Sequence, residues 1–246
     1  MEPDTLLNGT SEMLASEPLV LAAGLLCDDT IWSPVAAMLA EKDAPVLMRS
    51  FAGFTSIEAM AEALLAEAPP RFALAGHSMG ARVAIEAYRR APQRITRLAL
   101  LNTGVHPVQS HEASSRGRLV ALAKSSGMAA LAAEWLPPML GKGADDPQLL
   151  DLLTRMIERQ TPESFSAQIT ALLERPEAEK ALASVRVPTL LVSATRDRWS
   201  PVAQHEAMHR LLPSAELVVI EGAGHMAPIE APEAVAAALS EWRKDR

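Results

Sequence analysis

Residues 76–80, Gly-His-Ser-Met-Gly, have types and spacing that suit covalent chemistry. An apolar run precedes this segment and a helical pattern follows it. Between a strand and a helix, Gly-x-Ser-x-Gly forms a sharp turn that exposes the serine hydroxyl, and its glycines allow close backbone approach. We predict that Ser78 is a nucleophile and that the amide of Met79 is one donor of an oxyanion hole. Such pentapeptides also occur in ordinary loops, so a base and an acid are needed elsewhere.

His225 is the residue best placed to be the general base that an activated serine requires. It lies in a glycine-rich loop directly after the apolar run 217–220 and before a helical pattern. Loops at the carboxyl ends of parallel strands build the sites of open α/β sheets. A lone loop histidine is otherwise an ordinary surface residue, and the combination with Ser78 favours the catalytic interpretation.

Asp197 is the carboxylate predicted to orient that base. After a serine turn of this kind, the acid follows a strand and precedes the histidine in the chain. Asp197 directly follows the apolar run 189–193, whereas Asp28 lies too early and Asp145 lies in a region without predicted strands. The alternative for Asp197 is a surface ion pair with a neighbouring arginine.

A second oxyanion donor is predicted in residues 24–28, the loop after the first core strand. Gly24 permits a tight backbone there, and the amide of Leu25 is the candidate donor. A shift of the loop by one residue would give this role to Leu26.

A competing pattern is the His-Glu-x-x-His spacing that contains His205 and His209. On a helix this spacing puts both imidazoles on one face, as a zinc metalloprotease requires. A zinc site needs a third protein ligand, and His225, one of the candidates that follow, belongs to the loop already assigned. The apolar positions of the helix place both histidines in solvent. We therefore expect no metal site, and the metalloprotease is the weakest alternative.

Apolar strand-like runs alternate with helical patterns along most of the chain. Strands that are apolar along their whole length are covered on both faces, and alternation with helices is typical of a parallel sheet. The sequence thus predicts an α/β domain with a mostly parallel, twisted sheet and helices on both faces. The predicted strands are 19–23, 45–48, 72–75, 97–102, 187–193 and 216–220, and the predicted helices are 32–42, 56–68, 81–91, 201–212 and 232–243.

The segment 106–184 breaks this alternation, because it has helical patterns and no strand pattern. We expect a helical cap here, inserted into a core made of 1–105 and 185–246. The expected cap helices are 112–125, 128–135, 148–159 and 162–174. The first eighteen residues form either a hairpin around Asn8 or a loose arm.

Composition narrows the class of protein. The 246 residues are 49% hydrophobic, and the net charge of −7 argues against nucleic acid as a partner, which would need a basic face. Cys27 is the only cysteine, so no intrachain disulfide can form. The acidic N-terminus is unlike a secretory signal, and no apolar stretch is expected to be long enough to cross a bilayer. We expect a cytoplasmic protein with no membrane partner.

With these pieces in order, the chain resembles the α/β-hydrolase superfamily from about Leu19 to Trp242. The resemblance is carried by 19–32, by 76–80, by the Asp197 loop and by the His225 loop. It implies the α/β-hydrolase fold with an eight-stranded sheet, a helical cap and no cofactor or metal. It also implies the roles assigned above to Ser78, His225, Asp197 and the amides of Leu25 and Met79. This chain departs from many relatives at Ala23, where they have histidine, and at Ala81, where they often have glycine.

The predicted reaction is hydrolysis of a small or medium carboxylic ester through an acyl-enzyme. The apolar segment 135–140 in the cap favours a substrate with an apolar acyl or alkyl part. A lactone hydrolase, including an enol-lactone hydrolase, is the main alternative. A C–C bond hydrolase would use the same residues, but such relatives often have tryptophan where this chain has Met226. A ligand receptor of low turnover is a further alternative. The expected partner is a small molecule, and the oligomeric state is left open.

Overall fold

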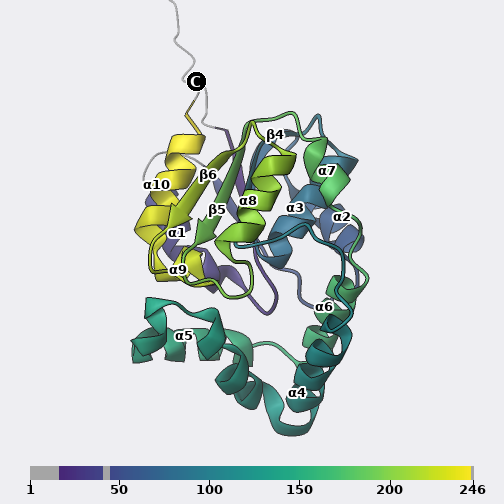
Figure 1. Cartoon of the computed structure of the whole chain (residues 1–246), viewed down its shortest axis with the longest axis vertical. Coiled ribbons are helices and arrows are strands. Elements are labelled where there is room, and N and C mark those ends of the chain that lie inside the picture. The colour runs from purple at the N-terminus through teal and green to yellow at the C-terminus, as the bar shows by residue number, and fades with distance from the viewer. Residues whose placement is uncertain (1–16, 41–44, 245–246) are drawn as a thin grey trace, which may run out of the picture.

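A parallel sheet of six strands lies at the centre of the fold (Figure 1). The computed structural model describes residues 17–40 and 45–244. The strands follow the spatial order β2-β1-β3-β4-β5-β6. The chain steps from β1 outward to β2 and returns to β3 on the other side of β1, a reversal beside which open α/β sheets bind ligands. The strands are β1 (Leu19–Ala22), β2 (Val46–Arg49), β3 (Phe72–His77), β4 (Ile95–Leu101), β5 (Thr189–Ala194) and β6 (Glu216–Ile220).

Helices cover both faces of the sheet, which confirms the predicted architecture (Figure 1). On one face α1 packs against α9 and α10, and on the other α2, α3, α7 and α8 contact one another in that order. Every residue of β1, β3 and β5 is buried, which explains why these runs are largely apolar instead of alternating. The helices are α1 (Ser33–Ala40), α2 (Ile57–Glu67), α3 (Met79–Arg90), α7 (Glu179–Ala183), α8 (Val202–Leu211), α9 (Ala227–Glu230) and α10 (Pro232–Trp242).

A helical segment between β4 and β5 lies at one end of the core, below it in Figure 1. Its longest helix, α4, packs against both α5 and α6. Gly127 breaks α4 with a φ of 83°, at the gap between the two helices predicted for this stretch. We propose that this segment is the cap, 106–184; its last helix, α7, packs against α3 and α8 of the core. The remaining elements are α4 (Glu112–Trp135), η2 (Pro137–Met139), η3 (Lys142–Asp145), α5 (Pro147–Glu158) and α6 (Pro162–Leu173).

One stretch of the cap, Glu112–Met139, is long and apolar enough to cross a membrane by length and composition alone. The expectation that no apolar stretch reaches this length was therefore wrong. The stretch includes the break at Gly127, and its helix packs on α5 and α6. These contacts are those of a cap helix on its neighbours.

Other expectations about the elements have mixed outcomes. The resemblance implies eight strands, whereas the described residues form six. The hairpin considered at Asn8 lies outside the described residues, as does the end of the helix predicted at 32–42. Ser56 is the N-cap of α2, and its hydroxyl accepts a hydrogen bond from the Ala59 amide at 3.1 Å. The short helix α9 was not predicted, because one turn leaves no periodic pattern.

Candidate active site

Three sequence-predicted residues meet at the carboxyl ends of β3, β5 and β6. The Ser78 hydroxyl lies 2.8 Å from Nε2 of His225, and Nδ1 of the same ring lies 2.9 Å from Oδ2 of Asp197. A carboxylate only accepts hydrogen bonds, so Nδ1 carries the proton and Nε2 is free to accept from Ser78. Such an arrangement can remove the serine proton as the hydroxyl attacks a carbonyl.

The Ser78 turn has strained backbone geometry. Ser78 has a φ of 56° and a ψ of −116°, outside the regions that non-glycine residues favour. Its amide donates to the Leu101 carbonyl of β4 at 2.9 Å, which helps to hold this conformation. A side chain at Gly76 would lie 2.6 Å from Cα of Ala81, and one at Gly80 would lie 2.6 Å from the Ala23 carbonyl oxygen. The two glycines therefore allow the strand, the turn and α3 to pack closely.

Substitution of Gly80 by alanine is expected to lower the free energy of unfolding by about 3 kcal/mol. The new methyl group would overlap backbone oxygens of Ala22 and Ala23, which the sheet holds in place. Alanine's helix propensity offsets only about 1 kcal/mol of this cost. Denaturant titration measures the change. Gly117 is the matched control, because it is exposed on α4 with nothing within 4 Å of an added methyl group; Gly117→Ala should be neutral or slightly stabilising. Equal stability of the two variants would contradict this steric account.

Asp197 is buried with 4% of its surface exposed, so it is not the surface ion-pair residue considered as an alternative. Its Oδ1 accepts the amides of Trp199 and Ser200, each at 2.8 Å. Burial favours the protonated acid, but the electrostatic interaction with the His225 ring and the hydrogen bonds from His225, Ser200 and Asn102 outweigh it, so the pKa of Asp197 lies well below its ordinary value. Asp197 is thus ionised throughout the neutral pH range.

Asn102 is a site residue that the sequence analysis missed. It follows β4 with a φ of 48° and is fully buried. Its amide nitrogen donates to Oδ2 of Asp197 at 3.0 Å and to the Gly224 carbonyl at 3.3 Å. Asn102 therefore holds the carboxylate against the His225 loop. The available signal was a polar residue at the carboxyl end of a buried strand.

The two candidate oxyanion donors both line the small pocket around Ser78. Met79 is the first residue of α3, where backbone amides have no acceptor within the helix. Leu25 follows β1, and Gly24 beside it lies so close to His77 that an added methyl group would approach Nδ1 to 2.9 Å. The amide of Leu26 donates to the buried Gln168 side chain at 3.0 Å. This bond favours Leu25 over Leu26 as the residue whose amide is available.

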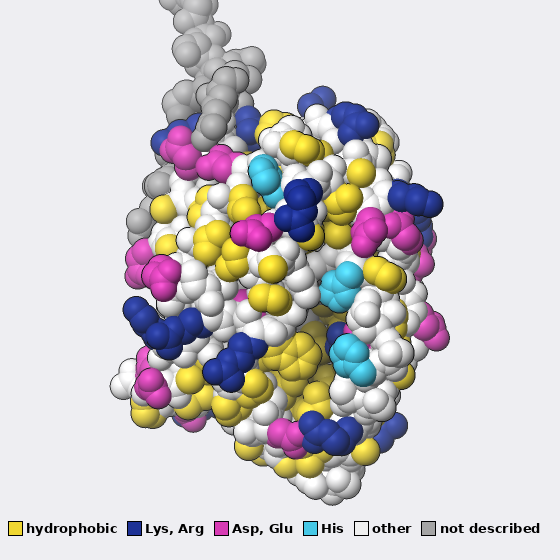
Figure 2. Space-filling view, viewed as in Figure 1, with side chains coloured by type: hydrophobic (Ala, Val, Ile, Leu, Met, Phe, Trp, Pro, Cys, Tyr) yellow, Lys and Arg dark blue, Asp and Glu magenta, His cyan; other side chains and the backbone are white. Residues whose placement is uncertain are grey.

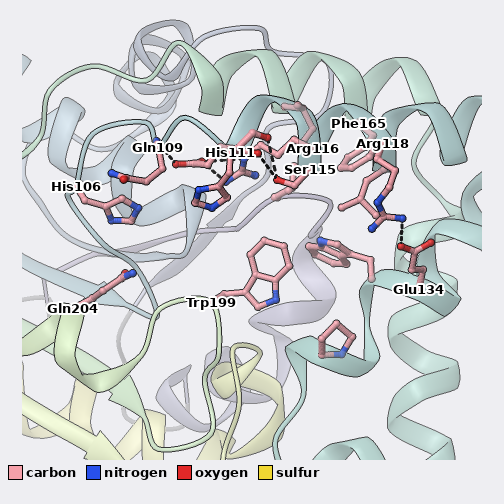
Figure 3. Close-up of a pocket in the computed structure, with 16 residues that line it drawn as sticks. His106, Gln109, His111, Ser115, Arg116, Arg118, Glu134, Phe165, Trp199 and Gln204 are labelled. Atoms are coloured by element: carbon pink, nitrogen blue, oxygen red, sulfur yellow. Dashed lines mark hydrogen bonds and ion pairs between the residues drawn. The ribbon is translucent and has the colours of Figure 1, made fainter.

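Two pockets lie between the core and the cap, where the molecular surface is hollowed (Figure 2). The outer one has a volume of about 570 Å³, and the inner one, of about 80 Å³, contains Ser78 and His225. In the outer pocket Trp199 projects toward a row formed by His106, Gln109 and His111 (Figure 3). The two pockets share part of their lining, which makes the outer one an approach to the serine. The shared residues are Leu25, His106, Arg116, Trp135 and Trp199.

Comparison with known proteins agrees with this fold. The profile described as the alpha/beta hydrolase family matches residues 19–238. The chain belongs to the alpha/beta hydrolase family. The match runs from β1 into α10, so it contains all six described strands together with Ser78, Asp197 and His225.

Relatives of this hydrolase include a biotin biosynthesis protein and a methyl ester esterase. It is 26% identical over 239 residues to the biotin biosynthesis bifunctional protein BioHC of Cellvibrio japonicus (strain Ueda107), a match that covers 91% of this chain but only 47% of that protein. It is 28% identical over 194 residues to a pimeloyl-[acyl-carrier protein] methyl ester esterase of Neisseria meningitidis, covering 76% of this chain and 75% of the relative.

Solved structures show the same fold. A thermophilic esterase from Thermogutta terrifontis has a TM-score of 0.82 and 28% identity, covering 92% of this hydrolase and 89% of the esterase. The enol-lactonase from Burkholderia xenovorans LB400 has a TM-score of 0.83, 23% identity and coverage of 92% and 91%, a likeness that concerns the fold. The resemblance to the α/β-hydrolase superfamily and to its esterase-like members is confirmed.

The His-Glu-x-x-His pattern of this hydrolase lies on α8, and one expectation about it was wrong. His205 is fully buried, not in solvent, because α8 packs this face against β5 and β6. Its Nε2 accepts the Thr103 amide at 3.2 Å, and the Thr103 hydroxyl donates to the Ser78 carbonyl at 3.0 Å. His205 thus supports the backbone beneath the serine. Within residues 17–40 and 45–244, no group of three or more His, Cys, Asp or Glu side chains could hold a metal ion.

Burial lowers the pKa of His205 to about 4, from about 6.5 in an unfolded chain. Between these values the unfolded chain binds a proton that the folded protein excludes, so this group's contribution to stability falls as pH falls from 6.5 toward 4. His205→Asn keeps an acceptor for Thr103 but does not titrate. We expect the stability advantage of the wild type over this variant to shrink by about 1 kcal/mol per pH unit below pH 6.5. Urea titrations at pH 8, 6 and 5 measure it, and a constant difference would contradict the assignment.

His77, next to Ser78 in the turn, contacts the backbone of the His225 loop. Its Nε2 lies 2.8 Å from the backbone carbonyl of His225. Burial, aided by the electrostatic effect of the His225 ring, lowers the pKa of His77 to about 3, so the His77 ring is neutral. A carbonyl only accepts hydrogen bonds, so Nε2 of His77 is the protonated nitrogen. Its hydrogen bond to the His225 carbonyl helps to hold the His225 loop in place.

The cap also contacts the His225 loop directly. The His225 amide donates to the Met139 carbonyl at 2.7 Å. The Glu230 carboxylate accepts the amide of Gly141 in the cap at 2.7 Å and the amide of Gly224 in the loop at 3.0 Å. Burial raises the pKa of Glu230 above its ordinary value, although these amides oppose the shift. The position of His225 is therefore coupled to the position of the cap.

Proposed function

We propose that this hydrolase cleaves a small or medium carboxylic ester by a serine mechanism. Ser78 is the nucleophile, His225 the general base and Asp197 the orienting acid, with the amides of Leu25 and Met79 as oxyanion donors. The observation that carries the proposal is the 2.8 Å contact between Ser78 and His225 at the floor of the pocket between core and cap. Cys27 also lines this pocket, but burial raises the pKa of its thiol to about 12, so it does not compete as a nucleophile.

The reaction proceeds in two stages. Ser78 attacks the ester carbonyl while His225 takes its proton, and the two amides stabilise the negative charge on the carbonyl oxygen. His225 then protonates the departing alcohol, and the acyl group remains bound to the Ser78 oxygen. In the second stage His225 takes a proton from water, which attacks the acyl group, and then returns that proton to the Ser78 oxygen as the acid is released. Asp197 stabilises the imidazolium that forms in both stages.

The pocket supports an ester of limited size as the substrate. The outer pocket has a volume of about 570 Å³, which suits a small molecule, and apolar side chains from the cap cover one part of it. The relative from Neisseria meningitidis is named as a methyl ester esterase, which is consistent with a small alkyl leaving group here. The apolar lining includes Leu25, Leu119, Trp135, Phe165, Ile169 and Trp199.

A substrate panel tests the proposed reaction. Carboxylic esters, lactones and diketone-like compounds are assayed with the wild type and with Ser78→Ala. We expect the highest turnover with esters and its loss in the variant. A preference for lactones would show that the protein is a lactone hydrolase, the main alternative, and not a hydrolase of open-chain esters. Tight ligand binding without turnover of any compound would favour a receptor and overturn the proposal.

A further inference from the structure

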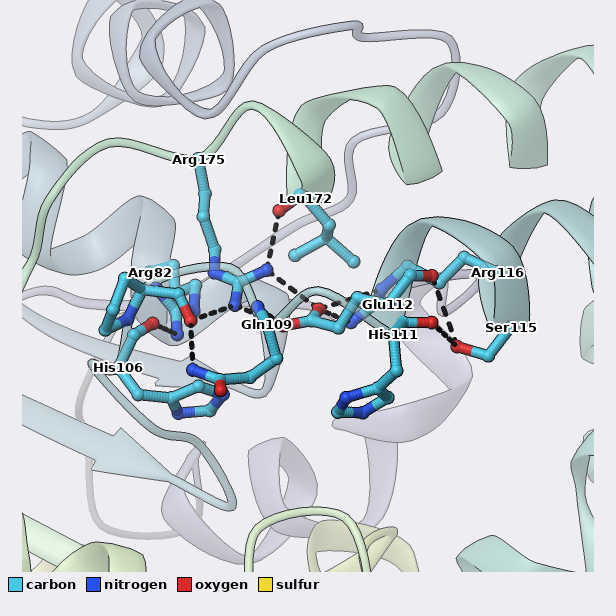
Figure 4. Close-up of polar contacts among 10 residues, drawn as sticks. Arg82, His106, Gln109, His111, Glu112, Ser115, Arg116, Leu172 and Arg175 are labelled. Atoms are coloured by element: carbon cyan, nitrogen blue, oxygen red, sulfur yellow. Dashed lines mark hydrogen bonds and ion pairs between the residues drawn. The ribbon is translucent and has the colours of Figure 1, made fainter.

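A cluster of arginines lies on the wall of the two pockets, in a protein whose net charge is −7 (Figure 4). It joins α3 and the end of α6 to the start of α4. Guanidinium groups outnumber carboxylates there, so an excess positive charge lies beside the proposed nucleophile. The cationic lining residues are Arg82, Arg116, Arg118 and Arg175, and the anionic ones are Glu112 and Glu134.

Both terminal nitrogens of Arg175 are engaged by the protein. Its side chain is only 3% exposed, and its two terminal nitrogens donate to the two oxygens of Glu112 at 2.6 and 2.9 Å. The same nitrogens also donate to the carbonyls of Leu172 and Pro107. Burial alone would raise the pKa of Glu112, but the hydrogen bonds from Arg175 and the Gln109 amide lower it to about 2. Glu112 is therefore ionised and neutralises one arginine.

Arg116 and Arg82 are less completely neutralised. Arg116 donates to Glu112 through Nε and one terminal nitrogen, both to Oε2, which Arg175 also contacts. Arg82 is 8% exposed and donates to the backbone carbonyl of His106 at 3.0 Å. Among the described residues no carboxylate lies within ion-pair distance of Arg82. Burial and the charge of Arg175 lower the pKa of Arg82 to about 9, so it is still cationic at neutral pH.

The two arginines are close to the reacting atoms. Arg82 follows Ser78 by four residues on α3, which is one helical turn, or about 6 Å along the axis. Both arginines line the inner pocket that contains Ser78 and His225. Burying cations without a counter-ion is costly, and a substrate anion would relieve that cost.

We propose that Arg82 and Arg116 bind a carboxylate carried by the ester substrate, a few bonds from the scissile carbonyl. Glu112 already places a carboxylate against Arg116 and Arg175, which shows that guanidinium groups of this cluster bind such a group. A guanidinium fork matches the two oxygens of a carboxylate. This inference rests on the proposed ester hydrolysis and specifies the substrate class as the half-ester of a dicarboxylic acid.

The test compares kcat/KM for monomethyl and dimethyl esters of succinate, glutarate and adipate, which differ in charge at the far end. In the wild type, the best half-ester is expected to exceed its diester by about tenfold or more. Arg82→Gln and Arg116→Gln should each lower kcat/KM for the half-ester by about 10- to 100-fold, and for the diester by no more than about threefold. Arg82→Lys should restore part of the preference. Arg155→Gln is the matched control, because Arg155 pairs with Asp151 on α5 and lines neither pocket, so its loss should leave the preference unchanged.

The outcomes separate this inference from the proposed function. Hydrolysis of diesters without preference for half-esters overturns the carboxylate site and leaves the esterase standing. An equal loss for both substrates in the arginine variants, with a matching loss of thermal stability, assigns the arginines a structural role and also overturns it. Stronger competitive inhibition by inorganic phosphate than by glutarate would show that the arginines bind a phosphate group, and would overturn the carboxylate site. Absence of hydrolysis of every ester refutes the proposed function itself.

Discussion

Ser78→Ala is expected to lower kcat for ester hydrolysis by about 10⁵-fold. The substitution removes the atom that forms the acyl-enzyme, whereas the pocket and the oxyanion amides remain. Substrate binding should change little, because the serine oxygen contributes mainly to the chemical step. A chromogenic short-chain ester measures the rate, and competitive inhibition by a product acid measures binding.

The fold of this variant should be intact, because the substitution removes only the Oγ atom and the backbone amide of residue 78 still donates to the Leu101 carbonyl. A melting temperature within a few degrees of the wild type is the control. Retention of more than a hundredth of wild-type kcat would show that another group attacks the substrate. His205→Asn serves as a second comparison, because it alters the support of the turn and leaves the nucleophile in place.

Asp197→Asn is expected to lower kcat by about 10⁴-fold. An asparagine can still accept the amides of Trp199 and Ser200 through its oxygen. Its nitrogen would then face Nδ1 of His225 as a donor, which forces the ring proton onto Nε2. That nitrogen could no longer take the Ser78 proton. The loss should appear in kcat at every pH, because Asp197 is ionised throughout the neutral range.

The matched control is Asp145→Asn, at an exposed aspartate in η3 of the cap. Its activity should equal that of the wild type. If Asp197→Asn lost less than tenfold, the carboxylate would not orient the base. Partial recovery in Asp197→Glu would support the charge as the required property.

Much of the fold follows from patterns that the solvent imposes on the chain. Strands β1, β3 and β5 are buried on both faces, so most of their residues are apolar, and the runs at 19–23, 72–75 and 187–193 predicted them within a few positions. The glycines at 76 and 80 marked the serine turn because no other side chain fits there. Since parallel strands end at one edge of the sheet, the residues after β3, β5 and β6 were expected to meet, and they do.

The polar contacts between distant segments were not predictable in the same way. Asn102 contacts Asp197, which lies 95 residues later, and a single asparagine after a strand carries no pattern that reveals it. His205 is buried because of how α8 packs, although its spacing with His209 resembled a metal motif. The arginine cluster joins α3, α4 and α6, so its net charge became visible only once the cap was placed on the core.

The most direct test of the central claim is labelling by a fluorophosphonate, which reacts with serine nucleophiles activated by a neighbouring base. The wild type is treated with the reagent, digested and analysed by mass spectrometry, with Ser78→Ala and Asp197→Asn treated in parallel. We predict a single adduct on Ser78 in the wild type, none in Ser78→Ala and much slower labelling in Asp197→Asn. An adduct on any other residue, or labelling of Ser78→Ala at the wild-type rate, would contradict the assignment of Ser78 as the nucleophile.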